Sequence, residues 1–471
     1  MNKDTNNVNN ETTKEHISRF GILVAVVAGL IGILYGYDSG TFSAVLPFWK
    51  EDFVIKPWME GLLGSSTIFG ITLGVITGGK VCDAIGRQRM MLVVVLGFAL
   101  TALLGAIPIS VWWLLGIRVC LGYFIGFSQV AGPLFIGEFA PERIRGALLV
   151  SYQIAQSIGH ILATYTAFFF VSSGTWELVV GIAAIPGLLL AIIIARFPDT
   201  PRWYLLKGKR EKAYQTMLRI EENETSTQEK IEEIEYELNN KLNKGKIKIK
   251  ELFEKKFSKR LLFVIGFGFF THITGMTAVN YYGPIIFQSV GFNLSDALLF
   301  TGIVQIAALF SEVIAFFLVD RWGRRPTLLL GIASMIVSLL ALSIIYFAGL
   351  GGIGGVIAII GVLVFRMGFG IGFGSMVWIY TTEMFPLRLR GVGASLLLTV
   401  NNLGSLTVAQ VFPIALSFVG GGYTFAGFTV LAIFAWFFIF ILAPETKGRS
   451  LEEINTYWEN GGKWTTSTET K

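Results

Sequence analysis

Long apolar stretches that follow one another along the chain constrain this protein more than any other feature of its sequence. Crossing the hydrocarbon core of a bilayer takes about 20 mostly apolar residues of helix, and the sequence contains twelve stretches of this kind. Several are longer than needed, which predicts tilted or bent spans and not additional ones. The predicted spans are 20–46, 58–80, 90–109, 111–136, 147–171, 176–196, 261–289, 297–319, 327–348, 353–381, 392–418 and 423–443.

Charged residues avoid these stretches and gather between the sixth and the seventh. The chain has 38 Lys and Arg and 32 Asp and Glu, 70 charged residues together, and 27 of them lie in residues 197–259. Charged residues make up only 15% of the whole chain, against about 25% in soluble proteins. The composition therefore excludes an ordinary soluble enzyme and predicts a protein whose main partner is the lipid bilayer.

The distribution of basic residues between the spans predicts the orientation of the chain. The loops after spans 2, 4, 8 and 10 contain arginines, whereas the loops after spans 3, 9 and 11 contain neither Lys nor Arg. Because cytoplasmic loops carry the excess of Lys and Arg, we expect both termini and residues 197–259 in the cytoplasm. The net charge of +6 then reflects this asymmetry, and no nucleic-acid partner is expected. The first 19 residues contain no apolar segment, so we expect no cleaved signal peptide and a multi-pass protein of the plasma membrane.

Three motifs occur twice at nearly one offset. The segment from Asp83 to Arg87 matches the one from Asp320 to Arg324 at an offset of 237, Glu138–Gly146 matches Glu383–Gly391 at 245, and Pro198–Arg202 matches Pro444–Arg449 at 246. The repeats predict two pseudo-symmetric six-helix halves. The expected organisation is a disordered tail 1–19, an N-terminal half 20–196, a helical linker 197–259, a C-terminal half 260–446 and a cytoplasmic tail 447–471.

The paired motifs place acids and arginines at the cytoplasmic helix ends of both halves. Carboxylate–arginine contacts at these ends predict a gate that holds the cytoplasmic side shut while the outside is open. Topology alone explains an arginine after a span, but not the same spacing of Glu, Pro, Arg and Gly in both halves. The predicted gate residues are Asp83, Arg87, Glu138, Arg145, Asp320, Arg324, Glu383 and Arg390.

On these motifs the chain resembles the sugar porter family of the major facilitator superfamily. The carrying segments are Gly79–Arg87, Pro133–Gly146, Pro198–Trp203, Asp320–Arg325 and Pro444–Arg449, and the resemblance covers roughly residues 20–455. It implies an all-α membrane protein with twelve transmembrane helices, a cytoplasmic helical insert and a monomeric state. The substrate site of such a protein lies between the halves near the bilayer midplane.

Ionisable residues inside predicted spans are candidates for function because they are costly there. Asp38 lies in span 1 and Arg118 in span 4, and a buried carboxylate beside a guanidinium forms a pair that a proton can switch. Proton-coupled members of the family resemble this chain in having Asp at the position of Asp38; a static ion pair is the alternative. Glu312 in span 8 has no partner that the sequence identifies, and it either faces the cavity as an extra acid or bonds within the bundle.

The resemblance also implies a sugar site, with departures from the family pattern. Span 7 of a typical sugar porter reads Gln-Gln-x-x-Gly-x-Asn, where this chain has Thr271, His272 and Thr277. The two cavity histidines make the site titratable near neutral pH, unless they only hydrogen-bond to neighbours. The implied binding residues are Gln153, His160, Thr271, His272, Thr277, Tyr281, Tyr282, Trp378 and Asn401.

The expected function is proton-coupled symport of a sugar or polyol, with the proton as coupling ion and no other cofactor or metal. A facilitative uniporter, a proton-coupled carrier of an organic acid or nitrogenous compound, and a nutrient sensor that does not transport are the alternatives. No phosphate-binding loop, metal cluster or nucleophile constellation appears, so an enzyme is not expected.

Overall fold

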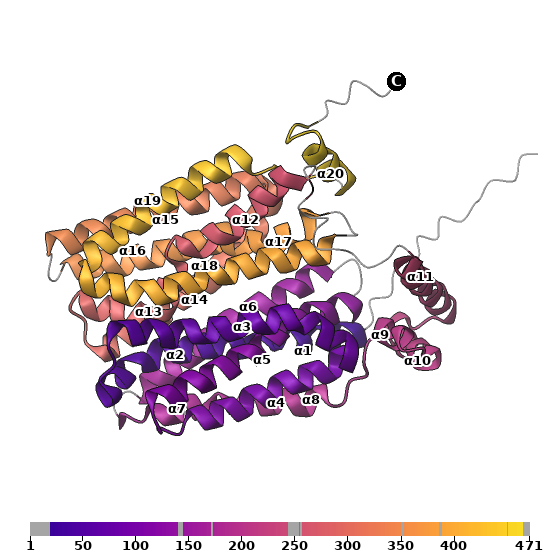
Figure 1. The fold of residues 1–471 in the computed structure, drawn as a ribbon, viewed down its shortest axis with the longest axis horizontal. Helices are drawn as coiled ribbons and strands as arrows, with labels where there is room; N and C mark the ends of the chain where they lie inside the picture. Colours follow the sequence, from indigo (N-terminus) through magenta and orange to yellow (C-terminus); the bar gives the residue numbers. More distant parts are fainter. Residues whose placement is uncertain are drawn as a thin grey trace, which may run out of the picture.

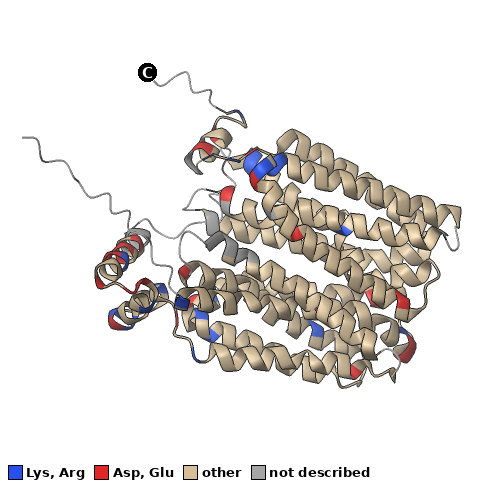
Figure 2. Ribbon diagram, turned by 180° about the vertical axis from the view of Figure 1, so that it is seen from behind, with Lys and Arg blue, Asp and Glu red and all other residues tan. Residues whose placement is uncertain are grey.

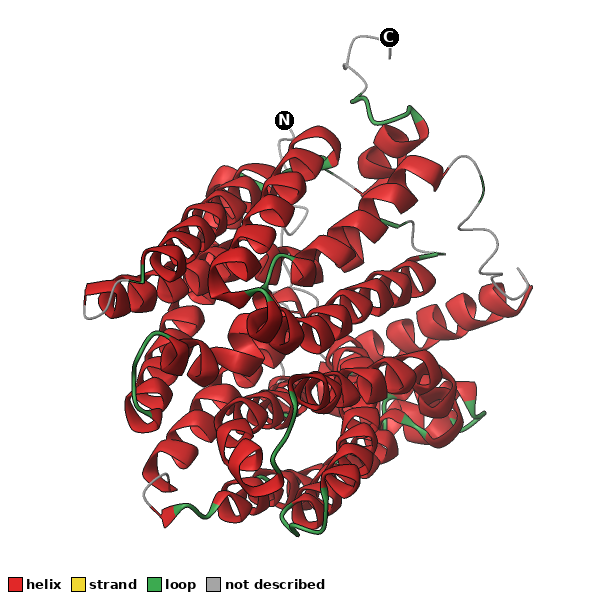
Figure 3. Ribbon diagram, turned by 60° about the vertical axis from the view of Figure 1, so that its left-hand side comes forward, coloured by secondary structure: helices red, strands yellow, loops and turns green. Residues whose placement is uncertain are grey.

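The computed structural model describes residues 19–139, 145–170, 173–243, 254, 257–349, 353–385, 389–449 and 451–464. In these residues all regular structure is helical, and no strand occurs (Figure 3). Long helices lie side by side along one direction, with the N-terminal helices on one side of the bundle and the C-terminal helices on the other (Figure 1). The predicted fold class is confirmed.

In the part of the chain that the structure describes, the N-terminal half contains eight helices that make six membrane-length segments. Two segments are broken by a short irregularity, one between α1 and α2 and the other between α7 and α8. The helices are α1 (Arg19–Leu30), α2 (Gly32–Phe53), α3 (Pro57–Ile85), α4 (Arg87–Gly105), α5 (Val111–Phe139), α6 (Arg145–Phe170), α7 (Trp176–Ile182) and α8 (Ala184–Ile194).

Glycines bring the helices of this half into very close contact. A Cβ on Gly36 of α2 would lie 1.7 Å from the carbonyl oxygen of Gln156 on α6, and one on Gly122 of α5 would lie 2.0 Å from that of Thr67 on α3. Small residues permit this approach, which drives helix association in a bilayer through packing. The contact of α2 with α6 holds Asp38 and the polar residues of α6 in one part of the bundle.

The C-terminal half repeats this arrangement with two breaks of its own. Gly275 has a φ of +103° and separates α12 from α13, and a π-helix separates α16 from α17. The elements are α12 (Ser258–Ile273), α13 (Met276–Ser289), α14 (Leu294–Trp322), α15 (Arg324–Ala348), α16 (Ile353–Phe369), η5 (Gly370–Gly374), α17 (Ser375–Glu383), α18 (Arg390–Phe418) and α19 (Gly420–Leu442).

Eleven helical segments of the described chain are long and apolar enough to cross a membrane. Helix α6, the predicted fifth span, is not among them, although its 26 residues extend for about 39 Å at 1.5 Å per residue. It is long enough but less apolar, because Gln153, Gln156, Ser157 and His160 lie within it. These residues point to α6 as the wall of a polar site inside the bundle.

The described residues of the predicted linker form three helices at one end of the bundle, α9 (Pro201–Leu206), α10 (Arg210–Glu221) and α11 (Glu224–Asn243). Ile231 is fully buried and joins Met217 in the apolar core of the N-terminal half. Helix α20 (Leu451–Glu459), within the predicted tail 447–471, lies at the same end. Charged residues gather there, and the long helices carry few (Figure 2). We call this the linker end, and the other the opposite end.

Candidate functional site

A chain of hydrogen bonds crosses between the two halves in the middle of the bundle. Glu312 on α14 accepts hydrogen bonds from Gln153 Nε2 at 3.3 Å and from Ser157 Oγ at 2.8 Å, both on α6. Gln153 Oε1 accepts in turn from Trp378 Nε1 on α17 at 3.1 Å. The structure therefore brings together two predicted substrate residues and the extra acid, and places Glu312 between the halves.

Glu312 also has a charged partner that the sequence analysis did not identify. Arg366 on α16 has its Nη2 atom 3.9 Å from Glu312 Oε1, and the two residues are only 5% and 7% exposed. The sequence left open whether Glu312 faces the cavity as an extra acid or bonds within the bundle, and its contacts in this conformation agree with the second alternative. Arg366 lies inside the predicted span 353–381, so it carries the same signal, an ionisable residue in an apolar stretch, that identified Asp38.

The two cavity histidines have polar neighbours on different helices. His160 Nδ1 lies 3.1 Å from Ser39 Oγ on α2, and His272 Nδ1 lies 2.9 Å from Thr277 Oγ1. The hydroxyl of Thr277 continues to Ser405 on α18 at 2.8 Å. These contacts agree with the alternative that each histidine hydrogen-bonds to neighbours.

Two further predicted binding residues, Asn401 and Thr271, differ in their surroundings. Asn401 is buried on α18, the helix that also carries Ser405, whereas Thr271 donates to the Phe267 carbonyl of its own helix at 2.8 Å. His272 is linked to the region of Arg366 through Phe369, whose ring lies 6.3 Å from the His272 ring and 5.7 Å from the Arg366 guanidinium carbon. Thr271 is thus the predicted residue whose hydroxyl is already used by its own backbone.

The structure brings Asp38 and Arg118 together inside the N-terminal half. Asp38 Oδ1 lies 3.6 Å from Arg118 Nη1, and each residue is 5% exposed. Arg118 Nε donates to the Leu63 carbonyl at 2.8 Å, and its guanidinium lies 4.1 Å from the centre of the Phe42 ring. Asp38 Oδ2 has no hydrogen-bond partner among the described residues, so this oxygen is available to a proton.

Aromatic contacts connect this pair to the other half. The Phe42 ring lies 5.2 Å from Tyr281 and 6.0 Å from Tyr282, both on α13. Tyr282 donates to the Ala409 carbonyl on α18 at 2.6 Å. The predicted tyrosine pair therefore belongs to the contact surface between the halves.

Polar side chains also join the halves toward the opposite end, where α3 begins. Ser65 Oγ on α3 donates to Gln410 Oε1 on α18 at 2.9 Å, and Gln410 Nε2 donates to the Trp58 carbonyl at 3.2 Å. The beginning of α3 and the last turns of α18 are therefore held together at this end of the molecule.

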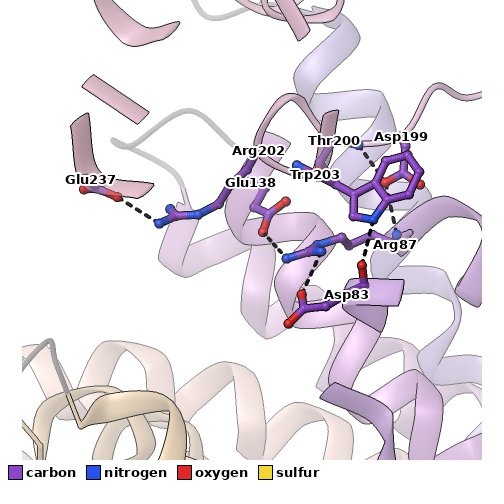
Figure 4. A network of polar contacts seen from close by, with 8 residues as sticks. All are labelled: Asp83, Arg87, Glu138, Asp199, Thr200, Arg202, Trp203 and Glu237. Carbon is purple, nitrogen blue, oxygen red and sulfur yellow. Dashed lines mark hydrogen bonds and ion pairs between the residues drawn. The ribbon is translucent and has the colours of Figure 1, made fainter. Parts of the chain in front are cut away.

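At the linker end, three of the gate residues predicted for the N-terminal half, Asp83, Arg87 and Glu138, form one network (Figure 4). Arg87 lies 3.0 Å from Asp83 and 3.2 Å from Glu138. Asp199 accepts hydrogen bonds from the backbone N–H of Arg87 at 3.0 Å and of Thr200 at 2.8 Å. Burial raises the pKa of Asp199, and these backbone hydrogen bonds oppose the rise. The acid of the Pro198–Arg202 motif thus caps the first turn of α4.

The C-terminal half repeats the network with equivalent residues. Arg324 lies 3.4 Å from Glu383 and 3.9 Å from Asp320. Glu445 accepts from the backbone N–H groups of Arg324 and Arg325 at 3.0 and 3.1 Å, as Asp199 does in the first half. In both networks these contacts join residues of one half.

Arg145 and Arg390, the remaining predicted gate residues, begin α6 and α18. Their side chains lie outside the part of the chain that the structure describes.

Comparison with known proteins places this architecture in a family. The family model described as "Sugar (and other) transporter" matches residues 24–458. The arabinose-proton symporter of Bacillus subtilis is 32% identical over 459 residues, which cover 95% of this chain and 97% of that protein. "Probable polyol transporter 3" of Arabidopsis thaliana is 32% identical over 485 residues, which cover 98% and 95%.

A solved structure shares the fold. The xylose transporter XylE of E. coli, in a partially occluded inward open conformation, superposes with a TM-score of 0.80 at 23% identity, covering 92% of this chain and all of that one. The resemblance found in the paired sequence motifs is thereby confirmed. The chain is a multi-pass membrane protein that belongs to the sugar transporter family of the major facilitator superfamily.

Proposed function

We propose that this protein is a proton-coupled symporter of a sugar or polyol that works by alternating access. The observation that carries the proposal is the buried ion pair of Asp38 and Arg118 beside the polar cluster that the two halves share, which consists of Gln153, Ser157, Glu312, Arg366 and Trp378. The relatives named an arabinose-proton symporter and a polyol transporter support the substrate class and the coupling ion. We place the linker end in the cytoplasm of a plasma-membrane protein and take the monomer as the working unit.

The proton acts on Asp38. The pair is neutral when Asp38 is ionised, and a buried pair is costly to break by removing one charge. Protonation of Asp38 leaves Arg118 held by the Leu63 carbonyl and the Phe42 ring. The Phe42 ring that contacts the Arg118 guanidinium also packs against Tyr281 on α13. A change at Asp38 can therefore be transmitted to α13, a helix of the other half that contributes residues to the predicted substrate site.

The substrate acts in the middle of the bundle. Hydroxyl groups both donate and accept hydrogen bonds, as the Gln153 amide does, and the Trp378 ring supplies an apolar face. In the conformation described, the halves are joined at the opposite end by Ser65 and Gln410, and the contacts of Arg87 and Arg324 lie within their own halves. This arrangement corresponds to a state closed to the outside, and the gate residues act when the rocking motion closes the linker end.

Uptake into proteoliposomes tests the proposal. A panel of labelled hexoses, pentoses, polyols and small organic acids is offered to the purified protein with and without an inward proton gradient. We expect a sugar or polyol to accumulate above its outside concentration only with the gradient. Uptake that reaches equilibrium regardless of the gradient makes the protein a uniporter, and transport confined to an acid or amine contradicts the substrate class.

A further inference from the structure

A second buried ion pair lies in the polar cluster, and the proton mechanism does not use it. Arg366 and Glu312 lie on α16 and α14 of one half, whereas the donors to Glu312 come from α6 of the other. The charges thus lie where the two halves and the predicted sugar residues meet.

Arg366 is short of hydrogen-bond partners in this conformation. Its Nε and Nη1 atoms are buried without a partner among the described residues, and its Nη2 atom is 3.9 Å from Glu312. That distance is too long for a direct hydrogen bond between Arg366 Nη2 and Glu312 Oε1. A single ligand oxygen about 2.8 Å from each of these two atoms would bridge them. A buried donor left without a partner is unfavourable, so the arginine favours a ligand that brings acceptor oxygens.

The charge balance of the site selects the kind of ligand. Glu312 and Arg366 together are neutral, so an anionic or cationic ligand would leave one uncompensated charge in a buried site, which is costly. A neutral hydroxyl adds no charge, and it donates and accepts at the same time. The long separation of the pair and its neutrality therefore both favour a hydroxyl group over a carboxylate or an ammonium.

We propose that Glu312 and Arg366 form the specificity-determining pair of the substrate site, in which one hydroxyl of a neutral sugar or polyol donates to Glu312 and accepts from Arg366. The hydroxyl has one proton and therefore takes the place of one of the two present donors to the carboxylate, Gln153 or Ser157; when it displaces Gln153, it frees that amide for a second hydroxyl. Sugar acids and amino sugars are excluded by their charge. This inference rests on the proposed function and names the substrate class within it.

The experiment compares binding to the purified full-length protein by titration calorimetry without a proton gradient. The ligands are the neutral sugar or polyol that the wild type binds best, its singly deoxygenated analogues, the corresponding sugar acid and the amino sugar. The variants are Glu312→Gln and, as a matched control, Asp296→Asn, which changes a half-buried acid near the start of the same helix.

The expected result is a change in charge selectivity. Glu312→Gln should bind the neutral ligand about 10- to 100-fold more weakly, as expected for loss of a hydrogen bond to a charged group. It should also bind the sugar acid that the wild type rejects, because Arg366 no longer has a counter-charge. One deoxygenated analogue should bind wild type and variant equally, since it lacks the hydroxyl that Glu312 contacts. Asp296→Asn should match the wild type with every ligand.

Two results would overturn the inference. One is an unchanged affinity in Glu312→Gln; the other is an equal loss for all analogues without gain of the acid, which indicates a purely structural role. If Glu312→Gln does not fold, Ser157→Ala replaces it: removal of a competing donor should strengthen binding of the neutral ligand, and weaker binding contradicts the proposal. Failure of the wild type to bind any neutral sugar or polyol overturns the proposed function as well, so the two failures are distinguishable.

Discussion

Replacing Asp38 by Asn should abolish the coupling of transport to protons while leaving the transport pathway intact. The carboxylate and the guanidinium lie 3.6 Å apart, so their attraction amounts to about 4–5 kcal/mol at an effective dielectric constant of about 20. Asn has nearly the same size and no charge, and Arg118 keeps its contacts with the Leu63 carbonyl and the Phe42 ring. The variant therefore resembles the wild type with Asp38 permanently protonated.

The assay measures accumulation and exchange in proteoliposomes. With one proton per substrate molecule, 100 mV of proton-motive force supplies about 2.3 kcal/mol, which sets an upper limit of about 50-fold accumulation at about 1.4 kcal/mol per factor of ten. The wild type should approach this limit. Asp38→Asn should reach an accumulation ratio of about 1, while exchange of labelled for unlabelled substrate continues.

The matched control is Asp52→Asn, which removes an exposed acid from the same helix, one whose carboxylate accepts a hydrogen bond from Trp176. It should accumulate substrate as the wild type does. Accumulation by Asp38→Asn well above a ratio of 1 would refute the assignment of the proton to this residue. Loss of exchange together with accumulation, in a protein that melts at the wild-type temperature, would show that the charge is needed for the conformational change itself.

Three further predictions follow from single contacts. Gly86→Ala should lower the melting temperature in detergent, by the equivalent of about 1–2 kcal/mol or more, because Gly86 has a φ of +104° and a Cβ there would lie 2.0 Å from Asp199 Oδ2. The control Gly79→Ala should leave the melting temperature unchanged, because no atom lies within 4 Å of a Cβ at that position. Trp378→Phe should weaken sugar binding by no more than about tenfold, through loss of the hydrogen bond to Gln153. Trp378→Ala should weaken it far more in the same titration. Equal losses in the two variants would contradict a stacking role for the ring. Ser65→Cys with Gln410→Cys, whose native side chains touch at 2.9 Å, should stop transport when bridged by a short thiol-specific cross-linker, whereas each single variant treated in the same way should transport.

The fold could be predicted from the sequence because a bilayer imposes helix on every apolar stretch long enough to cross it. Several helices extend beyond the predicted spans: 58–80 is helix Pro57–Ile85, and 297–319 is helix Leu294–Trp322, although the helix of span 90–109 ends earlier, at Gly105. Helices continue into the aqueous boundary, so an apolar run marks the membrane core and not the helix end. The break at Gly275 and the π-helix Gly370–Gly374 depend on packing, which the apolar pattern does not encode.

Most residues of the candidate site and the pairing of Asp38 with Arg118 could be predicted from the sequence, but the contacts between the halves could not. Asp38 and Arg118 stand out as charges in apolar spans, and the family motifs point to Gln153 and Trp378. No local pattern indicates that Gln153 bonds to Glu312 across the two halves, because that contact depends on how α6 packs against α14. Arg366 meets the criterion that identifies Asp38, but no family motif points to it.

In the proposed mechanism, the two buried ion pairs take part in different kinds of contact. Asp38 and Arg118 both belong to the N-terminal half. Protonation of Asp38 therefore changes the charge of that half, but it breaks no ion pair between the two halves. Glu312 bonds across the halves, so a substrate that competes for it changes the contact between them directly. Coupling then requires a link from the Asp38–Arg118 pair to the C-terminal half. The Phe42 ring lies at the position of such a link, because it contacts both Arg118 and Tyr281.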